Sequence, residues 1–255
     1  MKIVVAIKQV PARDSALRID PSGLWIAEDE LSYEINEADA YALEEGLELR
    51  EKHGGEVVVL CCGAPRAAQA IREALAKGAD RAIHIEEEKL GPLAVAGLMA
   101  KAIAPEQPDL VLTGLQSDDL GYGQTGVILA ELLGLPHASI VLEVEKLDGG
   151  LRVKRELEDG WFQHVEMPLP ALLTIQSGIK KLRYATLMGI KKARGKEIRR
   201  LTAADLGGVS IEDGGIRLGP VHLPKRSKQT QLLTGEPGRA AATLLEKLRT
   251  EARVL

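Results

Sequence analysis

The sequence predicts an α/β fold in which a mostly parallel sheet carries helices on both faces. Two observations support this class: short runs of β-branched residues alternate with longer helical patterns, and these runs are continuously apolar. Alternating strands and helices are typical of parallel sheets, and strands buried on both faces lose the polar–apolar alternation. With 255 residues, the chain is long enough for one large domain or two small ones.

Four strands are expected in the first half of the chain, with a helix after each. The strands cover residues 3–7, 56–62, 81–85 and 109–113, and the helices cover residues 36–53, 65–77, 90–104 and 123–133. The helices end beside residues that disfavour helix, namely Gly54, Gly78, Pro105 and Gly134. Because a crossover helix allows consecutive strands to run in the same direction, this rhythm predicts parallel pairing.

A different pattern begins at Pro136. Short strands are expected at residues 138–145, 151–157, 161–167 and 171–175, with turns at residues 148–150 and 159–160. Both turns contain Asp-Gly, which is typical of β-hairpins. The strand at residues 151–157 alternates apolar and charged side chains, as expected when one face meets solvent. These strands therefore predict an antiparallel extension of the parallel core.

The last fifth of the chain differs again. Residues 205–237 contain nine Gly or Pro and show no period, whereas residues 238–252 place an apolar stripe on one face of a helix. One interpretation is a disordered tail with a frayed helix. The other is an arm that wraps a partner, because the apolar stripe needs a surface that buries it.

Composition excludes several classes of protein. The chain has 33 Lys and Arg against 37 Asp and Glu, a balance that does not indicate a nucleic-acid binder. Two Trp, four Tyr and one Phe are too few aromatic rings for a surface on which bases stack. Cys61 and Cys62 are neighbours, which excludes an ordinary structural disulfide and favours a reducing compartment. No leader and no run of about 18 apolar residues is found. We expect a cytoplasmic protein without a membrane span that does not bind nucleic acid.

No catalytic residue and no metal site is expected. The sequence contains neither G-x-x-x-x-G-K-[ST] nor G-x-S-x-G, and the five histidines do not have the spacing of metal ligands. No nucleophile and base are paired in the sequence. The chain is therefore expected to bind a ligand without cutting it.

The candidate binding site is the glycine-rich loop 114–126, between the fourth strand and the next helix. Gly121, Gly123 and Gly126 match G-x-G-x-x-G, but the match is weak because a dinucleotide fingerprint normally follows the first strand. Small residues and a helix N-terminus still favour an anion, with Gln124 and Thr125 as further donors. The alternative is a flexible surface loop.

Other strand ends face the same crevice, because ligands of open parallel sheets lie beyond the carboxyl ends of the strands. These ends are residues 6–8 and 61–63, and residues 36–39 open the first helix beside them. Asn36 is equally well explained as a helix N-cap, and Cys62 as a small buried hydrophobe.

A strongly basic segment covers residues 180–200. It carries a net charge of +8, although the whole chain has −4, and it surrounds the apolar residues Leu187, Met188 and Ile190. A run of charge is usually a solvated face. Exposed apolar residues inside a basic rim instead favour a docking anchor for a protein, and the single Tyr184 makes RNA binding the weaker alternative.

At this point the chain resembles the beta (small) subunits of electron-transfer flavoproteins. Four pieces carry the resemblance, which extends from residue 2 to at least residue 206: residues 2–10 (KIVVAIKQV), 78–82 (GADRA), 124–126 (QTG) and 183–187 (RYATL). The last piece, followed by the basic residues 191–194, is the most specific.

The resemblance implies a Rossmann-like fold of the adenine-nucleotide-hydrolase type and a heterodimer with an alpha subunit that holds most of a redox-active FAD. Residues 1–180 would form a nucleotide-binding domain, 181–200 a partner-recognition loop and helix, and 201–255 an arm that wraps the alpha subunit. The implied AMP site contains Ala6, Asn36, Glu37, Ala38, Asp39, Cys62, Gly114, Gln116, Asp119, Gly123, Gln124 and Thr125. The implied docking residues are Tyr184, Leu187, Met188, Ile190, Lys191 and Lys192.

The resemblance also implies electron transfer without bond-making chemistry of the subunit's own, from acyl-CoA and other flavin dehydrogenases to a quinone oxidoreductase. A bifurcating, NADH-dependent branch of the family binds a second FAD in place of AMP and tends to have Val where Thr125 stands, so Thr125 favours the AMP-containing branch. Leu120 and Gly121 depart from the acidic run of the family. A universal-stress-like nucleotide-binding regulator is a further alternative, which leaves the basic segment and the arm unexplained.

Overall fold

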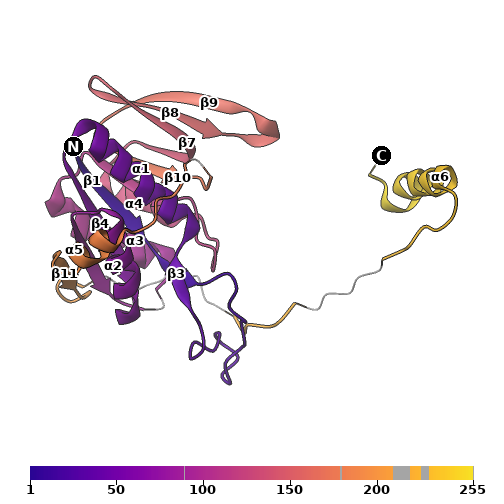
Figure 1. The fold of residues 1–255 in the computed structure, drawn as a ribbon, viewed down its shortest axis with the longest axis horizontal. Coiled ribbons are helices and arrows are strands. Elements are labelled where there is room, and N and C mark those ends of the chain that lie inside the picture. Colours follow the sequence, from indigo (N-terminus) through magenta and orange to yellow (C-terminus); the bar gives the residue numbers. More distant parts are fainter. Residues whose placement is uncertain (89, 179, 209–218, 225–229, 255) are drawn as a thin grey trace.

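The computed structural model describes residues 1–88, 90–178, 180–208, 219–224 and 230–254. Within these residues the chain forms a nine-stranded sheet, in the order β11-β5-β4-β1-β6-β10-β7-β8-β9, with helices on its faces (Figure 1). A separate antiparallel pair joins β2 (Gln9–Pro11) to β3 (Tyr33–Ile35). The α/β fold with a mostly parallel sheet is confirmed.

The parallel part of the sheet is buried on both faces at its central strands, whereas β7 and the edge strand β11 also carry exposed residues. Its strands are β1 (Lys2–Ile7), β4 (Glu56–Gly63), β5 (Arg81–Glu86), β6 (Leu110–Gly114), β7 (His137–Leu147), β10 (Ala171–Ile175) and β11 (Ile198–Leu201). In β1, Ile3 and Val5 enter one core and Val4 enters the other. Burial on two sides explains why these runs show no alternation.

The helices divide between the two faces. α1 (Glu37–His53) and α2 (Ala68–Lys77) contribute to the core that contains Ile3, whereas α3 (Pro92–Ile103) and α4 (Thr125–Leu133) contribute to the core that contains Val4. Short 3₁₀ turns precede α2 at Pro65–Ala67 and follow α3 at Ala104–Glu106. This division leaves the N-termini of α1 and α4 at the carboxyl end of the sheet.

The strand at residues 171–175 corrects the sequence prediction. It does not join the antiparallel extension: β10 lies between β6 and β7 and runs parallel to both. The extension consists of β7 with β8 (Gly150–Glu156) and β9 (Phe162–Pro168), separated by a 3₁₀ turn at Glu158–Gly160. Every residue of β10 is buried, which is typical of a central strand, so its position beside the hairpins in the sequence was misleading.

The basic segment contains a short helix, α5 (Leu187–Ala193), followed by β11 at the edge of the sheet. Thr186 starts this helix, because its hydroxyl oxygen accepts a hydrogen bond from the Gly189 N–H at 3.0 Å. α5 packs on α2 and not over the centre of the sheet.

The C-terminal helix α6 (Pro237–Lys247) stands apart from the α/β body (yellow in Figure 1) and continues into a π-helical turn at Leu248–Ala252. Its Leu244 and Leu245 are exposed. Parts of the irregular stretch expected at residues 205–237 lie outside the described residues. In the part of the chain that the structure describes, no helix is long and apolar enough to cross a membrane.

Candidate functional site

A pocket lies beyond the carboxyl ends of β1, β4 and β6, between the N-termini of α1 and α4 and the start of α3. It brings together most of the residues that were expected to bind a nucleotide: Ala6, Asn36, Asp39, Cys62, Gly114, Gln116, Gly123, Gln124 and Thr125. Glu37, Ala38 and Asp119 do not line it. The register explains the meeting, since Ala6 pairs with Leu60 across β1 and β4, and β6 runs parallel on the other side of β1.

Asp39 ties three elements of the pocket together. It stands in the first turn of α1, and its carboxylate accepts the N–H of Lys8 at 2.8 Å and the N–H of Gly114 at 2.9 Å. The first bond holds the end of β1 and the second holds the end of β6. Burial raises the pKa of Asp39 to about 7, against the opposing effect of the two N–H donors.

Asn36 has a structural task other than the one expected. As the residue before α1, its side chain makes no capping bond to the helix. Its amide nitrogen instead donates to the Gln116 carbonyl at 2.9 Å, and its amide oxygen accepts the Asp118 N–H at 2.8 Å. The alternative explanation of Asn36 as a side-chain N-cap is therefore wrong: both atoms of the amide group bond to the loop that follows β6 and fix it.

Two glycines allow close packing at the floor of the pocket. A Cβ on Gly114 would lie 2.3 Å from Asp39 Oδ1 and 2.8 Å from the Ala38 carbonyl carbon. A Cβ on Gly126 would lie 2.5 Å from Thr113 Oγ1. These positions let the N-termini of α1 and α4 approach the sheet, which explains why the sequence needs glycine at both.

The entry to α4 presents free backbone donors to the pocket. Gln124 precedes the helix without a side-chain capping bond, and Gly123 has a φ of +62°, a backbone conformation that favours glycine. The first N–H groups of a helix have no partner within the helix, and they carry its positive dipole end. The geometry therefore suits an anion beside residues 123–125.

Charged residues close the outer side of the loop. Lys8 Nζ lies 2.6 Å from Asp119 Oδ1 and 3.3 Å from Ser117 Oγ. Burial opposes ionisation of Asp119, but the charge and hydrogen bond of Lys8, together with hydrogen bonds from Ser117 and the Leu120 N–H, outweigh it and lower the pKa of that carboxyl. Glu37 faces away from the pocket and pairs with Arg13, which also lies 3.7 Å from Asp118. Asp119 and Glu37 thus hold the loop from outside.

An apolar wall completes the pocket, and sequence reasoning missed it. Leu90, Pro92, Val95 and Met99 line the side opposite α1. In the sequence these residues look like ordinary core residues of a helix. The one signal for a pocket wall was that Pro92 starts a helix just after the carboxyl end of a strand. Cys62 also lines the pocket, and burial raises the pKa of its thiol to about 12, so it is an unreactive thiol.

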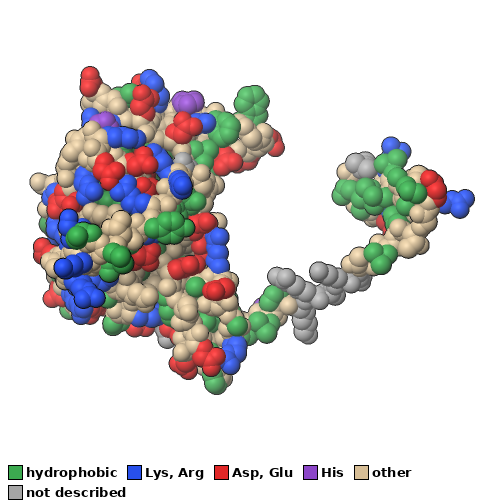
Figure 2. Space-filling model, in the orientation of Figure 1, with side chains coloured by type: hydrophobic (Ala, Val, Ile, Leu, Met, Phe, Trp, Pro, Cys, Tyr) green, Lys and Arg blue, Asp and Glu red, His purple; other side chains and the backbone are tan. Residues whose placement is uncertain are grey.

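The expected docking residues lie far from the pocket lining, on α5 and the chain that enters it. Tyr184 is 91% exposed and Leu187 is 88% exposed, and Met188, Ile190, Lys191 and Lys192 are also exposed. Figure 2 shows apolar and basic side chains next to one another over this region. Large exposed apolar side chains of this kind are typical of interaction surfaces.

The basic character of this segment is weaker than its sequence suggests. Lys180 pairs with Glu45 and Glu48, Arg183 with Glu44 and Glu51, and Arg200 with Glu86. Lys196 bonds to backbone carbonyls. Within the described part of residues 180–200, the exposed basic side chains without such a partner are Lys181, Lys191, Lys192, Arg194 and Arg199. The carboxylates that neutralise the others are distant in sequence, so the net charge of +8 overstated the basic surface.

In the described part of the chain, no group of three or more His, Cys, Asp or Glu side chains could hold a metal ion.

Comparisons with known proteins show which family the chain belongs to. The family model of the electron transfer flavoprotein domain matches residues 23–206. The chain is 37% identical to the "Electron transfer flavoprotein subunit beta" of Methylophilus methylotrophus over 96% of this chain and 97% of that protein. It is 37% identical to the same subunit of Bradyrhizobium diazoefficiens over the whole of both chains, and 36% identical to that of Homo sapiens over 81% and 83%. The chain belongs to the electron transfer flavoprotein family, among its beta subunits.

Proposed function

We propose that this chain pairs with an alpha subunit and that the heterodimer carries electrons from flavin dehydrogenases, acyl-CoA dehydrogenases among them, to a quinone oxidoreductase. The observation that carries the proposal is that a chain of this family has both a pocket beyond the carboxyl ends of β1, β4 and β6 and a separate exposed apolar surface. In the heterodimer FAD supplies the redox chemistry, and it is held mainly by the alpha subunit. This chain makes and breaks no bonds itself.

The pocket is proposed to hold AMP. Its residues fit the two ends of a mononucleotide: the wall of Leu90, Val95 and Met99 is apolar, as a base requires, and the start of α4 offers unpaired N–H donors, as a phosphate requires. Ala6, Asn36, Asp39 and Gly114 would form the floor. In this interpretation AMP is structural, because it fills the crevice that the strand ends leave.

The remaining regions are proposed to bind proteins. Residues 184–192 would dock the dehydrogenase, with Leu187 as the anchor. Residues 201–255 would wrap the alpha subunit, which would bury the apolar stripe of α6. The complex would act in the cytoplasm, in fatty acid β-oxidation.

The deciding experiment is to release and quantify the nucleotides of the co-purified heterodimer. We expect one AMP and one FAD for each heterodimer, because the pocket is lined for one nucleotide and the loop around Thr125 is closed by the Lys8–Asp119 pair. Two FAD and no AMP would contradict the proposal and favour a bifurcating, NADH-dependent flavoprotein. Tight FAD binding by this chain alone would also contradict it.

Leu187→Ala tests the docking surface. The half-saturating concentration (KM) of the heterodimer, as the electron acceptor of an acyl-CoA dehydrogenase, should rise about tenfold or more. The reason is that an anchor residue carries a large share of the binding energy of an interface. AMP and FAD contents should not change, since Leu187 is 88% exposed and outside the pocket. Leu132→Ala, which shortens an exposed leucine of α4, is the matched control. A loss of both nucleotides in Leu187→Ala would instead assign this residue to the core.

A further inference from the structure

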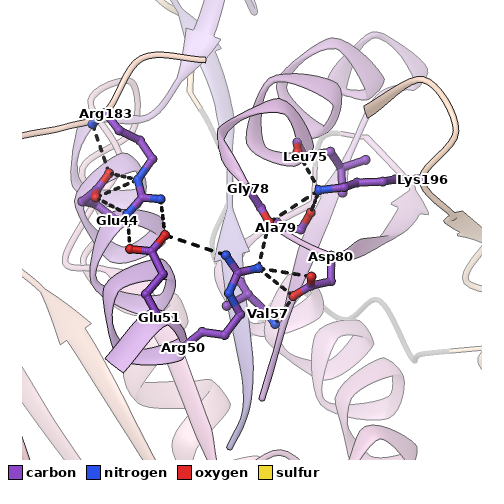
Figure 3. Close-up of polar contacts among 10 residues, drawn as sticks. All are labelled: Glu44, Arg50, Glu51, Val57, Leu75, Gly78, Ala79, Asp80, Arg183 and Lys196. Atoms are coloured by element: carbon purple, nitrogen blue, oxygen red, sulfur yellow. Dashed lines mark hydrogen bonds and ion pairs between the residues drawn. The ribbon is translucent and has the colours of Figure 1, made fainter. Parts of the chain in front are cut away.

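The turn at residues 78–80 does not line the nucleotide pocket, yet it lies in one of the four pieces of sequence that carry the resemblance to the family. The structure places this turn under the docking segment, residues 183–196. Both ends of that segment are connected to it by charged side chains, which Figure 3 shows together. The connection at each end can be followed residue by residue.

At the first end, Arg183 forms ion pairs with two carboxylates of α1. Its guanidinium lies 2.8 Å from Glu44 Oε1 and 2.6 Å from Glu51 Oε1, and its backbone N–H donates to Glu44 Oε2 at 3.0 Å. The Glu44 side chain is buried, with 7% exposed, so it has few alternatives to this partner. The two carboxylates raise the pKa of Arg183, which stays charged.

Further contacts connect Glu51 to the turn at residues 78–80. Arg50 lies beside Glu51 at 3.9 Å, and its Nη1 contacts Asp80 Oδ2 at 3.0 Å and the Gly78 carbonyl at 2.9 Å (Figure 3). Asp80 in turn accepts the Val57 N–H at 2.8 Å, which fixes it to β4. Arg183 is thus connected to the sheet through three further side chains, Glu51, Arg50 and Asp80, whose charges alternate.

At the other end, Lys196 closes the segment onto the same turn. Its ammonium donates to the carbonyls of Leu75, at 3.1 Å, and of Gly78 and Ala79. These carbonyls lie in the last turn of α2 and just beyond its C-terminus, where a cation is favoured by the helix dipole. Burial lowers the pKa of Lys196, and the nearby charge of Asp80 opposes this effect.

The middle of the segment rests on α2 without room to shift. A Cβ on Gly189 would lie 2.3 Å from the Ala76 carbonyl oxygen, and Arg72 Nη1 donates to the Ala193 carbonyl at 2.7 Å. The contact side of α5 is therefore fixed, while Tyr184 and Leu187 project outward.

We propose that Arg183 and Lys196 form a two-ended charge clamp on the turn at residues 78–80, and that this clamp holds the docking segment in its binding conformation before the partner arrives. Arg183 and Lys196 are then positioning residues that need not touch the partner. The inference rests on the proposed docking function. Its physical basis is that a segment ordered in advance loses less conformational entropy on binding.

The test compares Arg183→Met and Lys196→Met with Lys181→Met in the intact heterodimer. All three remove one positive charge near the segment, but Lys181 is exposed and takes no part in the clamp. Amide hydrogen exchange of residues 184–195 should become about tenfold faster in the two clamp variants and stay at the wild-type rate in Lys181→Met. Unchanged exchange in both clamp variants would overturn the proposal.

The second readout is docking to an acyl-CoA dehydrogenase with its acyl-CoA substrate. The KM for the heterodimer should rise about 3- to 10-fold in Arg183→Met at constant kcat and constant AMP and FAD content. Arg183→Lys keeps the charge but loses the planar fork, so it should restore only part of the effect.

Two further variants keep the outcomes distinct. Glu51→Gln, which changes a half-exposed carboxyl, opens the link to Arg50 without leaving Glu44 unpaired in the interior, and it should raise exchange even if Arg183→Met folds poorly. If Leu187→Ala raises the KM but no clamp variant changes exchange, the clamp is overturned and the docking function stands. If the clamp variants change exchange but neither they nor Leu187→Ala change the KM, the docking function is overturned.

Discussion

Gly114→Ala should lower the thermal midpoint of the heterodimer by about 5–10 °C and remove most of its bound AMP. The new Cβ would lie 2.3 Å from Asp39 Oδ1, 2.7 Å from the Asp39 nitrogen and 2.8 Å from the Ala38 carbonyl carbon. The side-chain oxygen can rotate away, but the two backbone atoms move only if α1 moves. Overpacking of this kind costs roughly 1–3 kcal/mol, and a chain of this size changes by about 2–4 °C for each kcal/mol.

The loss of AMP has a separate cause in the same substitution. If α1 shifts, the Gly114 N–H loses its bond to Asp39, and the loop that Asn36 holds moves with the helix. Gly63→Ala is the matched control, because it lies at the carboxyl end of β4, on the other side of β1, and its Cβ would meet Ala67 Cβ at 3.4 Å, an ordinary contact. Thermal unfolding and quantification of released AMP measure both effects. Wild-type AMP content in Gly114→Ala would show that the approach of α1 to β6 does not shape the pocket.

Asp39→Asn should destabilise the protein more at low pH than at neutral pH. The amide offers one acceptor where the carboxyl group offers two, so one of the N–H groups of Lys8 and Gly114 would lose its partner, at a cost of about 1–3 kcal/mol. The pH dependence has another origin. Burial raises the pKa of Asp39 to about 7, whereas the unfolded chain has an aspartate pKa of about 3.9.

The sign follows from proton binding. Between about pH 4 and pH 7 the folded protein holds a proton on Asp39 that the unfolded chain has released, so the stability that this group contributes is complete below pH 4 and is lost as the pH rises through 7. The loss is on the order of 3–4 kcal/mol over that interval. Denaturant unfolding of both proteins from pH 4.5 to pH 8 measures it as a difference that shrinks with pH. A difference that grows with pH would show that the two N–H donors keep Asp39 ionised.

The central strands could be predicted because their sequence and their environment agree. The expected strands at residues 3–7, 56–62 and 109–113 contain the uninterrupted apolar runs 3–7, 57–62 and 110–112, and each became a strand with a buried centre. β10 is equally apolar, but its position after two hairpins in the sequence led to the wrong strand pairing. Five apolar residues do not indicate which strands lie beside them in the sheet. β2 and β3 were missed because three-residue strands carry too short a pattern.

The floor of the pocket could be predicted and its wall could not. Strand ends and glycines mark the floor in the sequence, so Ala6, Gly114 and Gly123 were placed correctly in the pocket lining. Leu90, Val95 and Met99 carry no mark that separates them from core residues. The charge clamp was missed for a different reason: Arg183 and Glu44 are 139 residues apart in sequence, and such a pair becomes visible only when the chain is folded.

Helix α1 acts as a spacer with a fixed length. Its first turn, at Asp39, holds the strand ends of the pocket, and its later turns, at Glu44 and Glu51, hold Arg183. At 1.5 Å per residue, Asp39 and Glu51 are separated by about 18 Å along the axis. The separation between the pocket and the segment at residues 183–196 is thus set by one helix and by no loop. The loop between β2 and β3 and the hairpins of β7 to β9 can change in length without moving one site relative to the other.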